Sequence, residues 1–368
     1  MLRASFFGHF CAGADVHEIQ PALKSLASAG IGGILDYAAE ADVAHPRDLN
    51  GVDQTLVSAR TYEYEGEAHE DDARALFDAM DQSSRDGVID YVDWVSFLDP
   101  LDLTMGPLTQ FIDAEPLSTG EKAQLRNMIH RLEALASDAA ARGVKLMVDA
   151  EQTYLQPGID HLALGLQRQY NRGGRDVVYN TFQCYLTMSS DRIDIDLERA
   201  RREQFQFACK LVRGAYMVQE RKRAKDMGYP DPIHASLEAT HANYDAQVAK
   251  LLRHNHLASF MVASHNETSV QRTVREMARL GIDRATGGVY FGQLLGMCDH
   301  VSFTLGAERF KVFKYVPYGP VQEVLPYLVR RAQENSGLMT GAGKEMELLS
   351  TEIWRRLLPG RKSLAASA

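Results

Sequence analysis

The sequence alternates short apolar runs with segments of helical periodicity, and this alternation limits the possible folds more than any other feature. The apolar runs are residues 32–37, 145–152, 177–186, 207–217, 259–266, 288–295 and 310–319. Strands that alternate with helices along a chain form a parallel sheet, which is typical of the α/β class. Seven candidate strands come close to a (β/α)8 barrel, with one strand unaccounted for.

Signals for helix ends support this interpretation. Residues 17–30 are predicted to form a helix that ends at Gly30, because glycine favours the position just after a helix. Ser118 and Glu121 have the spacing of a capping box and precede a long amphipathic segment. A last helix is predicted over residues 321–336.

Charge and composition exclude several classes of protein. The net charge of −9 argues against a general nucleic-acid binder, because such a protein needs a basic face. Four cysteines without a CxxC pair fit a reduced interior and no zinc ribbon. No apolar run is long enough to span a bilayer, and the chain starts with neither a signal peptide nor a full transit peptide. Neither a Rossmann nor a P-loop glycine pattern is present, which disfavours both nucleotide sites.

Residues 71–98 resemble an EF-hand. Counted from Gly87 at position 6 of a calcium loop, Ile89 falls at position 8 and Asp93 at position 12. Gln82 occupies position 1, where a carboxylate belongs, and position 12 lacks the bidentate glutamate. We therefore predict a helical insertion that keeps the shape without a metal, with calcium binding as the less favoured alternative.

Polar side chains end most of the apolar runs. The active site of a barrel lies at the carboxyl ends of its strands. A single polar strand end usually belongs to a turn, but several together favour a shared pocket. These side chains are Asp149, Glu151, Gln183, Arg213, His265, Asn266 and Gln293.

The last helix carries the most distinctive local pattern. Its polar residues share one face at i, i+3, i+4 and i+7, and they are Tyr327, Arg330, Arg331 and Glu334. The opposing apolar residues include Val324, Leu325, Leu328 and Val329. Adjacent arginines can bind a carboxylate through paired, charge-assisted hydrogen bonds, and a glutamate can orient one of them. An ordinary solvated face is the alternative.

Lys210 and Lys314 lie inside apolar runs and allow a different chemistry. A barrel lysine can form a Schiff base, which would indicate an aldolase-type lyase. The alternative is a lysine that pairs with a carboxylate or with the phosphate of a ligand.

Six segments, in order, resemble the flavin-dependent proline dehydrogenases. They are LMVDAEQTY (146–154), FQCYL (182–186), KLVRGAYM (210–217), VASHNE (262–267), YFGQLLGMCD (290–299) and KYVPYGPVQEVLPYLVRRAQENS (314–336). FFGHFCAGAD (6–15) is similar to the N-terminal part of the animal enzymes. The likeness is nearly continuous from about residue 120 to 358 and patchier over 1–65.

The resemblance implies a distorted (β/α)8 barrel that holds FAD non-covalently. It implies oxidation of L-proline to Δ1-pyrroline-5-carboxylate by hydride transfer to flavin N5, with ubiquinone as the electron acceptor. The expected location is the matrix side of the mitochondrial inner membrane, with peripheral membrane contact and a targeting segment absent from this chain. The expected parts are an N-terminal helix and first strand (1–70), the insertion (71–117), the main barrel (118–345) and a C-terminal helix and tail (346–368).

The resemblance also assigns substrate residues. Arg330 and Arg331 correspond to the arginines that hold the proline carboxylate, and Glu334 to the acid that pairs with them. The remaining assignments are Tyr327 and Tyr315 as ring-packing tyrosines, Leu211 as an apolar contact, Tyr216 as a residue near flavin and substrate, and Asp149 as the aspartate near the flavin.

The expected FAD-lining residues are Gln183, Lys210, Arg213, Gly214, Ala215, Tyr216, His265, Asn266 and Gln293. The resemblance places Lys210 near flavin N5, where a positive charge stabilises the reduced flavin. That role replaces the Schiff-base interpretation.

Two features bear on how far the resemblance extends. The bulky ring of Tyr315 favours proline over 4-hydroxyproline, although residues 298–306 and 354–360 resemble the hydroxyproline-oxidising branch. The family's early strand, similar to IKLTAL, has a lysine that helps to bind the substrate carboxylate, and no such sequence occurs here.

A missing strand would leave two unpaired sheet edges. Residues 57–64, residues 88–98 or a second chain could fill the gap, or the barrel is open. We expect weaker proline binding without the lysine. A calcium-regulated enzyme and an inactive, regulatory relative are the alternatives.

Overall fold

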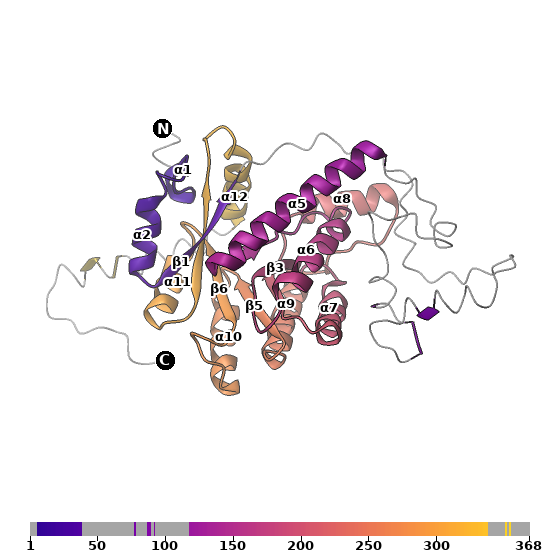
Figure 1. Cartoon of the computed structure of the whole chain (residues 1–368). Helices are drawn as coiled ribbons and strands as arrows, with labels where there is room; N and C mark the ends of the chain where they lie inside the picture. The colour runs from indigo at the N-terminus through magenta and orange to yellow at the C-terminus, as the bar shows by residue number, and fades with distance from the viewer. Residues whose placement is uncertain are drawn as a thin grey trace, which may run out of the picture. The chain divides into compact units, whose positions relative to one another are not determined.

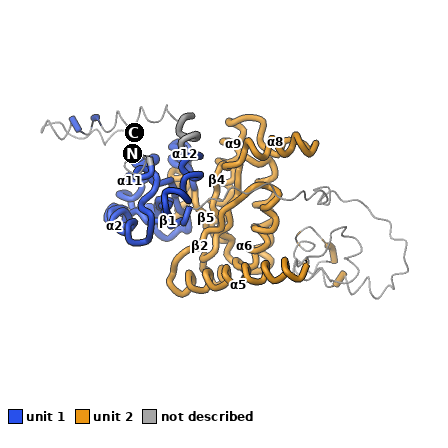
Figure 2. Tube along the Cα trace, turned by 90° about the horizontal axis from the view of Figure 1, so that it is seen from above, with its two compact units in different colours: residues 1–43, 263–272, 283–368 blue, residues 44–262, 273–282 orange. Residues whose placement is uncertain are grey.

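A computed structural model describes residues 6–38, 77–78, 87–89, 92, 118–337, 350–351 and 353–354. The chain forms two compact units (Figure 2). Unit 1 comprises residues 1–43, 263–272 and 283–368, and unit 2 comprises residues 44–262 and 273–282. Helix α10 (Glu267–Leu280) contributes residues to both.

In its described residues, unit 1 contains three parallel strands in the order β1-β7-β6. Its elements are α1 (Phe6–Phe10), α2 (Gln20–Ser28), β1 (Ile31–Tyr37), β6 (Val289–Leu294), α11 (Asp299–Ala307), β7 (Val312–Tyr318) and α12 (Leu325–Gly337) (Figure 1). The register of β1 and β7 pairs Ile31 with Val312 and Tyr37 with Tyr318. The predicted first strand and last helix are thus confirmed.

Unit 2 contains the strand order β5-β4-β3-β2, and its paired strands are parallel. Its strands are β2 (Leu146–Met147), β3 (Val178–Gln183), β4 (Phe207–Val212) and all but the last residue of β5 (Ala258–Ala263). Its helices are α5 (Thr119–Arg142), α6 (Gln156–Tyr170), α7 (Ser189–Glu203), α8 (Met217–Met227) and α9 (Leu237–Arg253) (Figure 1). Strand and helix alternate as predicted, which confirms the α/β class.

Burial explains why the apolar runs identified the strands. All six residues of β3 are buried, as are the first five of β4 and of β5. A strand that is covered on both faces has a continuous apolar sequence instead of an alternating one. Strand β2 is only two residues long, so the run 145–152 is mostly loop.

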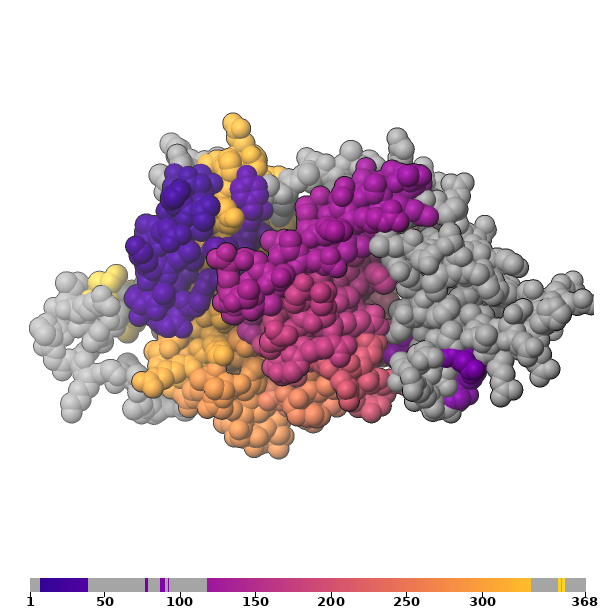
Figure 3. Space-filling model, in the orientation of Figure 1, coloured from indigo at the N-terminus to yellow at the C-terminus, as the bar shows by residue number. Residues whose placement is uncertain are grey.

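The predicted helix ends agree with the structure. Ser118 is the N-cap of α5; its Oγ accepts the Glu121 N–H at 3.3 Å, and its own N–H donates to Glu121 Oε2 at 2.9 Å. Helix α5 ends at Arg142 and is capped by Gly143, and α2 ends at Ser28, two residues before Gly30; both glycines have positive φ. Only Ala136 of α5 is fully buried, and the helix lies along the surface of unit 2 (Figure 3).

A buried amide joins three elements of unit 2. Asn171 follows α6 and has no exposed surface. Its Oδ1 accepts the N–H groups of Val177 and Val178 at 2.9 and 2.8 Å. Its Nδ2 donates to the carbonyls of Val178 and Gln206 at 2.8 and 3.1 Å. One side chain therefore satisfies buried backbone groups at the start of β3 and just before β4.

The EF-hand-like insertion lies mostly outside the described residues. Gly87 has φ +78°, the left-handed conformation that favours glycine in a tight turn. Most of 71–117, the whole of 57–64 and most of 346–368 fall outside the description. The helical insertion, the replacement of the missing strand and the domain boundaries therefore stay predictions.

Candidate active site

Lys210 lies at the carboxyl half of β4 in unit 2. Its side chain is 11% exposed, and its ammonium forms an ion pair with Asp149, which follows β2 and is 51% exposed. The neighbours Cys209 and Leu211 are fully buried. Two residues expected near the flavin are thus in direct contact. An ammonium held by a carboxylate has no lone pair for a Schiff base, so the contact disfavours the lyase interpretation.

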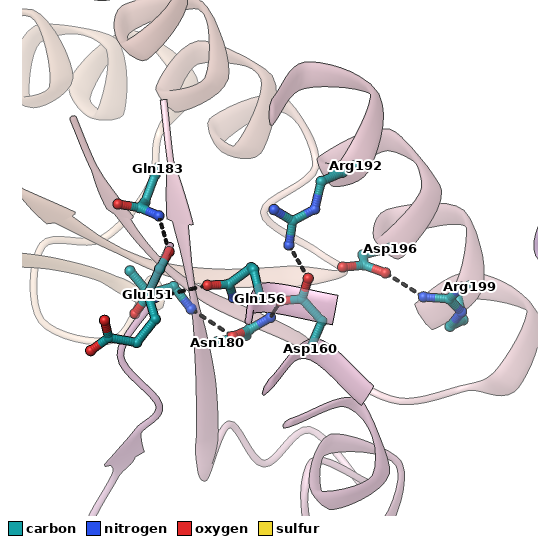
Figure 4. A network of polar contacts seen from close by, with 9 residues as sticks. Glu151, Gln156, Asp160, Asn180, Gln183, Arg192, Asp196 and Arg199 are labelled. Carbon is teal, nitrogen blue, oxygen red and sulfur yellow. Dashed lines mark hydrogen bonds and ion pairs between the residues drawn. The ribbon is translucent and has the colours of Figure 1, made fainter. Parts of the chain in front are cut away.

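Hydrogen bonds fix the loop that carries Asp149 (Figure 4). Gln183 Nε2 donates to the Glu151 carbonyl at 2.8 Å, and the Glu151 N–H donates to Gln156 Oε1 at 2.9 Å. Gln156 Nε2 in turn donates to Asp160 Oδ1 at 2.8 Å, and Asp160 pairs with Arg192. Gln183 is 3% exposed, and this hydrogen bond holds its amide against the loop.

A tight turn follows β4 at Gly214, with φ +136°. A Cβ at this position would lie 2.4 Å from two carbon atoms of the Tyr185 ring. The N–H of Tyr185 donates to the Arg213 carbonyl at 2.7 Å. Gly214 and Ala215 are exposed, and Tyr216 is the N-cap residue of α8. Tyr185 therefore shapes the turn, a role that the sequence analysis did not predict.

Arg213 is held by residues of α9 that the sequence analysis also missed. Its Nε donates to His241 Nδ1 at 2.8 Å, and its guanidinium carbon lies 4.2 Å from the centroid of the Tyr244 ring. Burial lowers the pKa of Arg213. The pKa of His241 is also lowered, mainly by burial and to a smaller extent by the charge of Arg213. The i, i+3 spacing of His241 and Tyr244 is the only sequence signal for this pair, and nothing local links it to Arg213.

Helix α12 in unit 1 carries the paired arginines, but its buried face differs from the prediction. Val324, Tyr327 and Leu328 are 0%, 3% and 1% exposed. Leu325 and Val329, which were expected among the apolar residues opposite the arginines, are 43% and 48% exposed. Burial on this helix therefore does not follow the division into an arginine-bearing face and an apolar face, since a tyrosine ring can bury as much apolar surface as a leucine. Tyr327 therefore faces the core of unit 1.

The arginines themselves lie at the border of that core. Arg330 and Arg331 are both partly exposed, and the guanidinium carbon of Arg331 lies 5.3 Å from the centroid of the Tyr327 ring. Tyr315 on β7 packs against the cluster of buried residues in unit 1 that includes Tyr327. Two of the expected substrate residues, Arg331 and Tyr327, are therefore in contact, and Tyr315 packs against the same group of buried side chains. The side chain of Glu334 lies outside the described residues, so its assignment stays a prediction.

Lys314, on β7, has a structural environment. Its side chain is 1% exposed, and its ammonium pairs with Asp299 at 2.7 Å. It also donates to the carbonyls of Leu294 and Met297 at 3.2 and 2.5 Å. The interpretation of Lys314 as a lysine paired with a carboxylate is confirmed.

The other expected FAD residues of unit 1 are fixed by neighbouring groups. His265 Nε2 accepts the Leu294 N–H at 3.0 Å. Gln293 Nε2 donates to the Ser264 carbonyl at 3.3 Å, and its Oε1 accepts from Ser302 Oγ at 2.9 Å. Asn266 Oδ1 accepts the Ser269 N–H at 3.0 Å, at the start of α10. These contacts hold the three side chains in defined orientations.

Comparisons with known proteins identify the family. A sequence model described as "Proline dehydrogenase" matches residues 19–341. The chain belongs to the proline dehydrogenase family. "Proline dehydrogenase 1, mitochondrial" of Homo sapiens is 36% identical, and the match covers 98% of this chain and 81% of the human protein. The predicted family and enzyme class, an oxidoreductase, are thus confirmed.

A further relative and a solved structure are also similar to this chain. "Hydroxyproline dehydrogenase" of Xenopus laevis is 47% identical over 67% of this chain and 53% of its own length. The crystal structure of "proline utilization A (PutA) from Bdellovibrio bacteriovorus inactivated by N-propargylglycine" has a TM-score of 0.63 at 20% identity. It matches 90% of this chain, which spans 33% of that longer protein. The likeness confirms the distorted (β/α)8 barrel as the fold class.

The match with the human protein also bears on the missing strand. It extends over 487 aligned positions, whereas this chain has 368 residues. The human protein therefore contains residues that have no counterpart here. This agrees with a chain that is shortened relative to the animal enzymes.

Proposed function

We propose that this chain oxidises L-proline to Δ1-pyrroline-5-carboxylate with non-covalently bound FAD. The observation that carries the proposal is the pair of partly exposed arginines on α12, beside Tyr315 and Tyr327, in a chain of this family. Guanidinium groups bind a carboxylate through paired hydrogen bonds, and the partly exposed ring of Tyr315 offers apolar surface to a pyrrolidine ring, while Tyr327 belongs to the buried cluster against which Tyr315 packs.

The residues of unit 2 fit a flavin dinucleotide. The exposed turn at Gly214 and Ala215 has no bulky side chain, and it lies between the cation Arg213 and the aromatic Tyr216. The buried ammonium of Lys210, which is paired with Asp149, supplies a second cationic group in a chain whose net charge is −9. These cationic groups would attract the diphosphate of FAD and the anionic form of the reduced flavin ring. FAD, when bound, accepts the hydride, which no amino-acid side chain can do.

The remaining roles are proposed from the family resemblance. Arg330 and Arg331 hold the proline carboxylate, and Glu334 orients them. Leu211 and Tyr216 contact the substrate, and Asp149 keeps Lys210 in place. The other proposed FAD residues are Gln183, His265, Asn266 and Gln293. Hydrogen bonds fix the orientation of these amide and imidazole groups, and the orientation determines which hydrogen bonds each group can form with a ligand.

Proline is the proposed substrate, and 4-hydroxyproline is the second candidate. Tyr315 places a bulky ring beside the substrate cluster, which disfavours an added hydroxyl group. The relative named hydroxyproline dehydrogenase, at 47% identity, supports the second candidate. The ratio of kcat/KM for the two substrates distinguishes them.

We also propose ubiquinone as the electron acceptor and the matrix side of the mitochondrial inner membrane as the location. The human relative is named mitochondrial, which supports the compartment. Within the residues that the structure describes, no helix is long and apolar enough to cross a membrane. Peripheral contact, which the family resemblance implies, is the proposed mode, and fractionation of mitochondria with a ubiquinone-reduction assay tests it.

An absorbance spectrum, recorded before and after anaerobic addition of L-proline, tests the central proposal. Flavin bands that bleach with proline support both the cofactor and the hydride transfer. Flavin bands that persist contradict a working substrate site and favour the inactive relative. A colourless protein that takes up no FAD contradicts the proposal, and borohydride trapping on Lys210 would then support the lyase. A proline KM as low as that of relatives with the lysine strand would contradict the expected weaker binding.

A further inference from the structure

Helix α9 is fastened to the ends of β3 and β4. Asn243 Nδ2 donates to the Cys184 carbonyl at 2.8 Å, just after β3. Tyr244 Oη donates to the Leu211 carbonyl at 3.3 Å, inside β4. Gln247 Nε2 donates to Asn243 Oδ1 at 2.8 Å, which fixes that amide. Because the residues after these strands are proposed to hold FAD, α9 forms part of the support of the site.

The same helix face determines where the Arg213 side chain points. Tyr244 has no exposed surface, so its ring is a fixed platform 4.2 Å from the guanidinium carbon. His241, one turn earlier, accepts the Nε–H of Arg213 at 2.8 Å. A guanidinium is planar, so fixing its Nε also fixes the directions of its other N–H groups. Of the two α9 residues, only His241 can change from acceptor to donor near neutral pH.

We propose that His241 is a positioning residue that holds Arg213 in the orientation needed to bind FAD, an inference that rests on the proposed function. His241 acts through Arg213 and needs no contact with the cofactor. The nitrogen that accepts from Arg213 must be unprotonated, so the ring is neutral in this arrangement. An arginine that loses this acceptor keeps its charge and the Tyr244 ring contact, but it loses the hydrogen bond that fixes the direction of its Nε–H.

The test measures the Kd for FAD of the full-length apoprotein by quenching of flavin fluorescence. His241→Phe keeps a ring but removes the acceptor, and it is expected to raise Kd about tenfold, because a hydrogen bond to a charged group is lost. His241→Asn keeps an acceptor atom at nearly the same place and is expected to stay within about threefold of the wild type. His256→Phe, at an exposed position of the same unit, is the matched control and should leave Kd unchanged.

A double-mutant cycle separates positioning from general stability. In the Arg213→Ala background, His241→Phe is expected to change Kd less than twofold, because the group through which it acts is gone. A tenfold effect that persists in this background overturns the inference. An unchanged Kd for the single His241→Phe variant also overturns it, while leaving the proposed function intact. A wild-type protein that binds no FAD overturns both.

The pH dependence of FAD binding gives an independent readout. Burial and Arg213 lower the pKa of His241, whereas Asp245 and Glu238 on the same helix oppose that shift. The Cys184 thiol, which interacts with Arg213, has a pKa that burial raises to about 12, so it stays neutral. Protonation of His241 removes the acceptor, so the wild-type Kd should rise at acidic pH. The same rise in His241→Asn would contradict the proposal, because Asn does not titrate.

Discussion

Replacing Gly214 with alanine should destabilise unit 2 by two separable effects. The backbone at this position has φ +136°, a region that only glycine adopts readily, and strain of this kind costs about 1–3 kcal/mol. The added Cβ would also lie 2.4 Å from two carbons of the Tyr185 ring, which is 4% exposed and has little room to move. Overpacking of this kind adds about 1–3 kcal/mol. The sum is a loss of about 2–6 kcal/mol in the free energy of unfolding.

Gly228 provides a matched control in the same unit. It follows α8 with φ +75°, and a Cβ there would have no atom within 4 Å. Gly228→Ala should therefore show the backbone cost alone, about 1–2 kcal/mol. Urea unfolding of the full-length apoprotein, followed by circular dichroism, gives both values, and FAD titration shows whether the turn still binds the cofactor.

The contribution of the clash can be isolated with Tyr185→Leu. The smaller side chain removes ring atoms from the space next to Gly214, so the double variant should be more stable than the sum of the single effects by about 1–3 kcal/mol. Equal losses for Gly214→Ala and Gly228→Ala, or strict additivity with Tyr185→Leu, would refute the reasoning.

Three further variants test other features. Asn171→Leu should lower the free energy of unfolding by about 2–6 kcal/mol, because the buried N–H groups of Val177 and Val178 lose their acceptor. The control Asn127→Leu, on the exposed face of α5, should change that free energy by less than about 0.5 kcal/mol. Urea unfolding measures both values. Tyr315→Ser should raise the ratio of kcat/KM for 4-hydroxyproline to kcat/KM for proline about tenfold. An unchanged ratio would show that Tyr315 does not determine the choice between these substrates. Burial raises the pKa of Asp196 to about 6, so its contribution to stability is greatest at low pH and is lost as the pH rises from about 4 through 6. Between pH 4 and pH 7, the free energy of unfolding of Asp196→Asn should therefore rise by up to about 3 kcal/mol relative to that of the wild type. Parallel pH profiles of unfolding free energy for the two proteins would contradict this.

The sequence predicted the strands well because their signal is local. The run 177–186 is apolar throughout, since β3 is covered on both faces. The extent of β2 was overestimated, because Asp149 and Glu151 belong to a loop that is held by hydrogen bonds from Gln183 and Gln156. Such bonds join residues far apart in the chain and leave no periodic pattern.

The site was only partly predictable for the same reason. The arginine pair on α12 has a clear spacing, but the spacing could not show that Tyr327 faces the core and Val329 the solvent. His241 and Tyr185 have no motif of their own; their importance follows from contacts with Arg213 and Gly214 across the fold. The assignment of cofactor residues depended on the family resemblance, because no residue spacing specifies a flavin by itself.

The two histidines described above carry their protons on opposite nitrogens. A backbone amide cannot give up its proton, so the Leu294 N–H fixes His265 as the Nδ1–H tautomer. The Arg213 Nε–H fixes His241 as the Nε2–H tautomer in the same way. Nitrogen NMR distinguishes these forms, so the proton distribution at each ring can be observed directly. His265 thus presents a hydrogen-bond donor at Nδ1, and His241 presents one at Nε2.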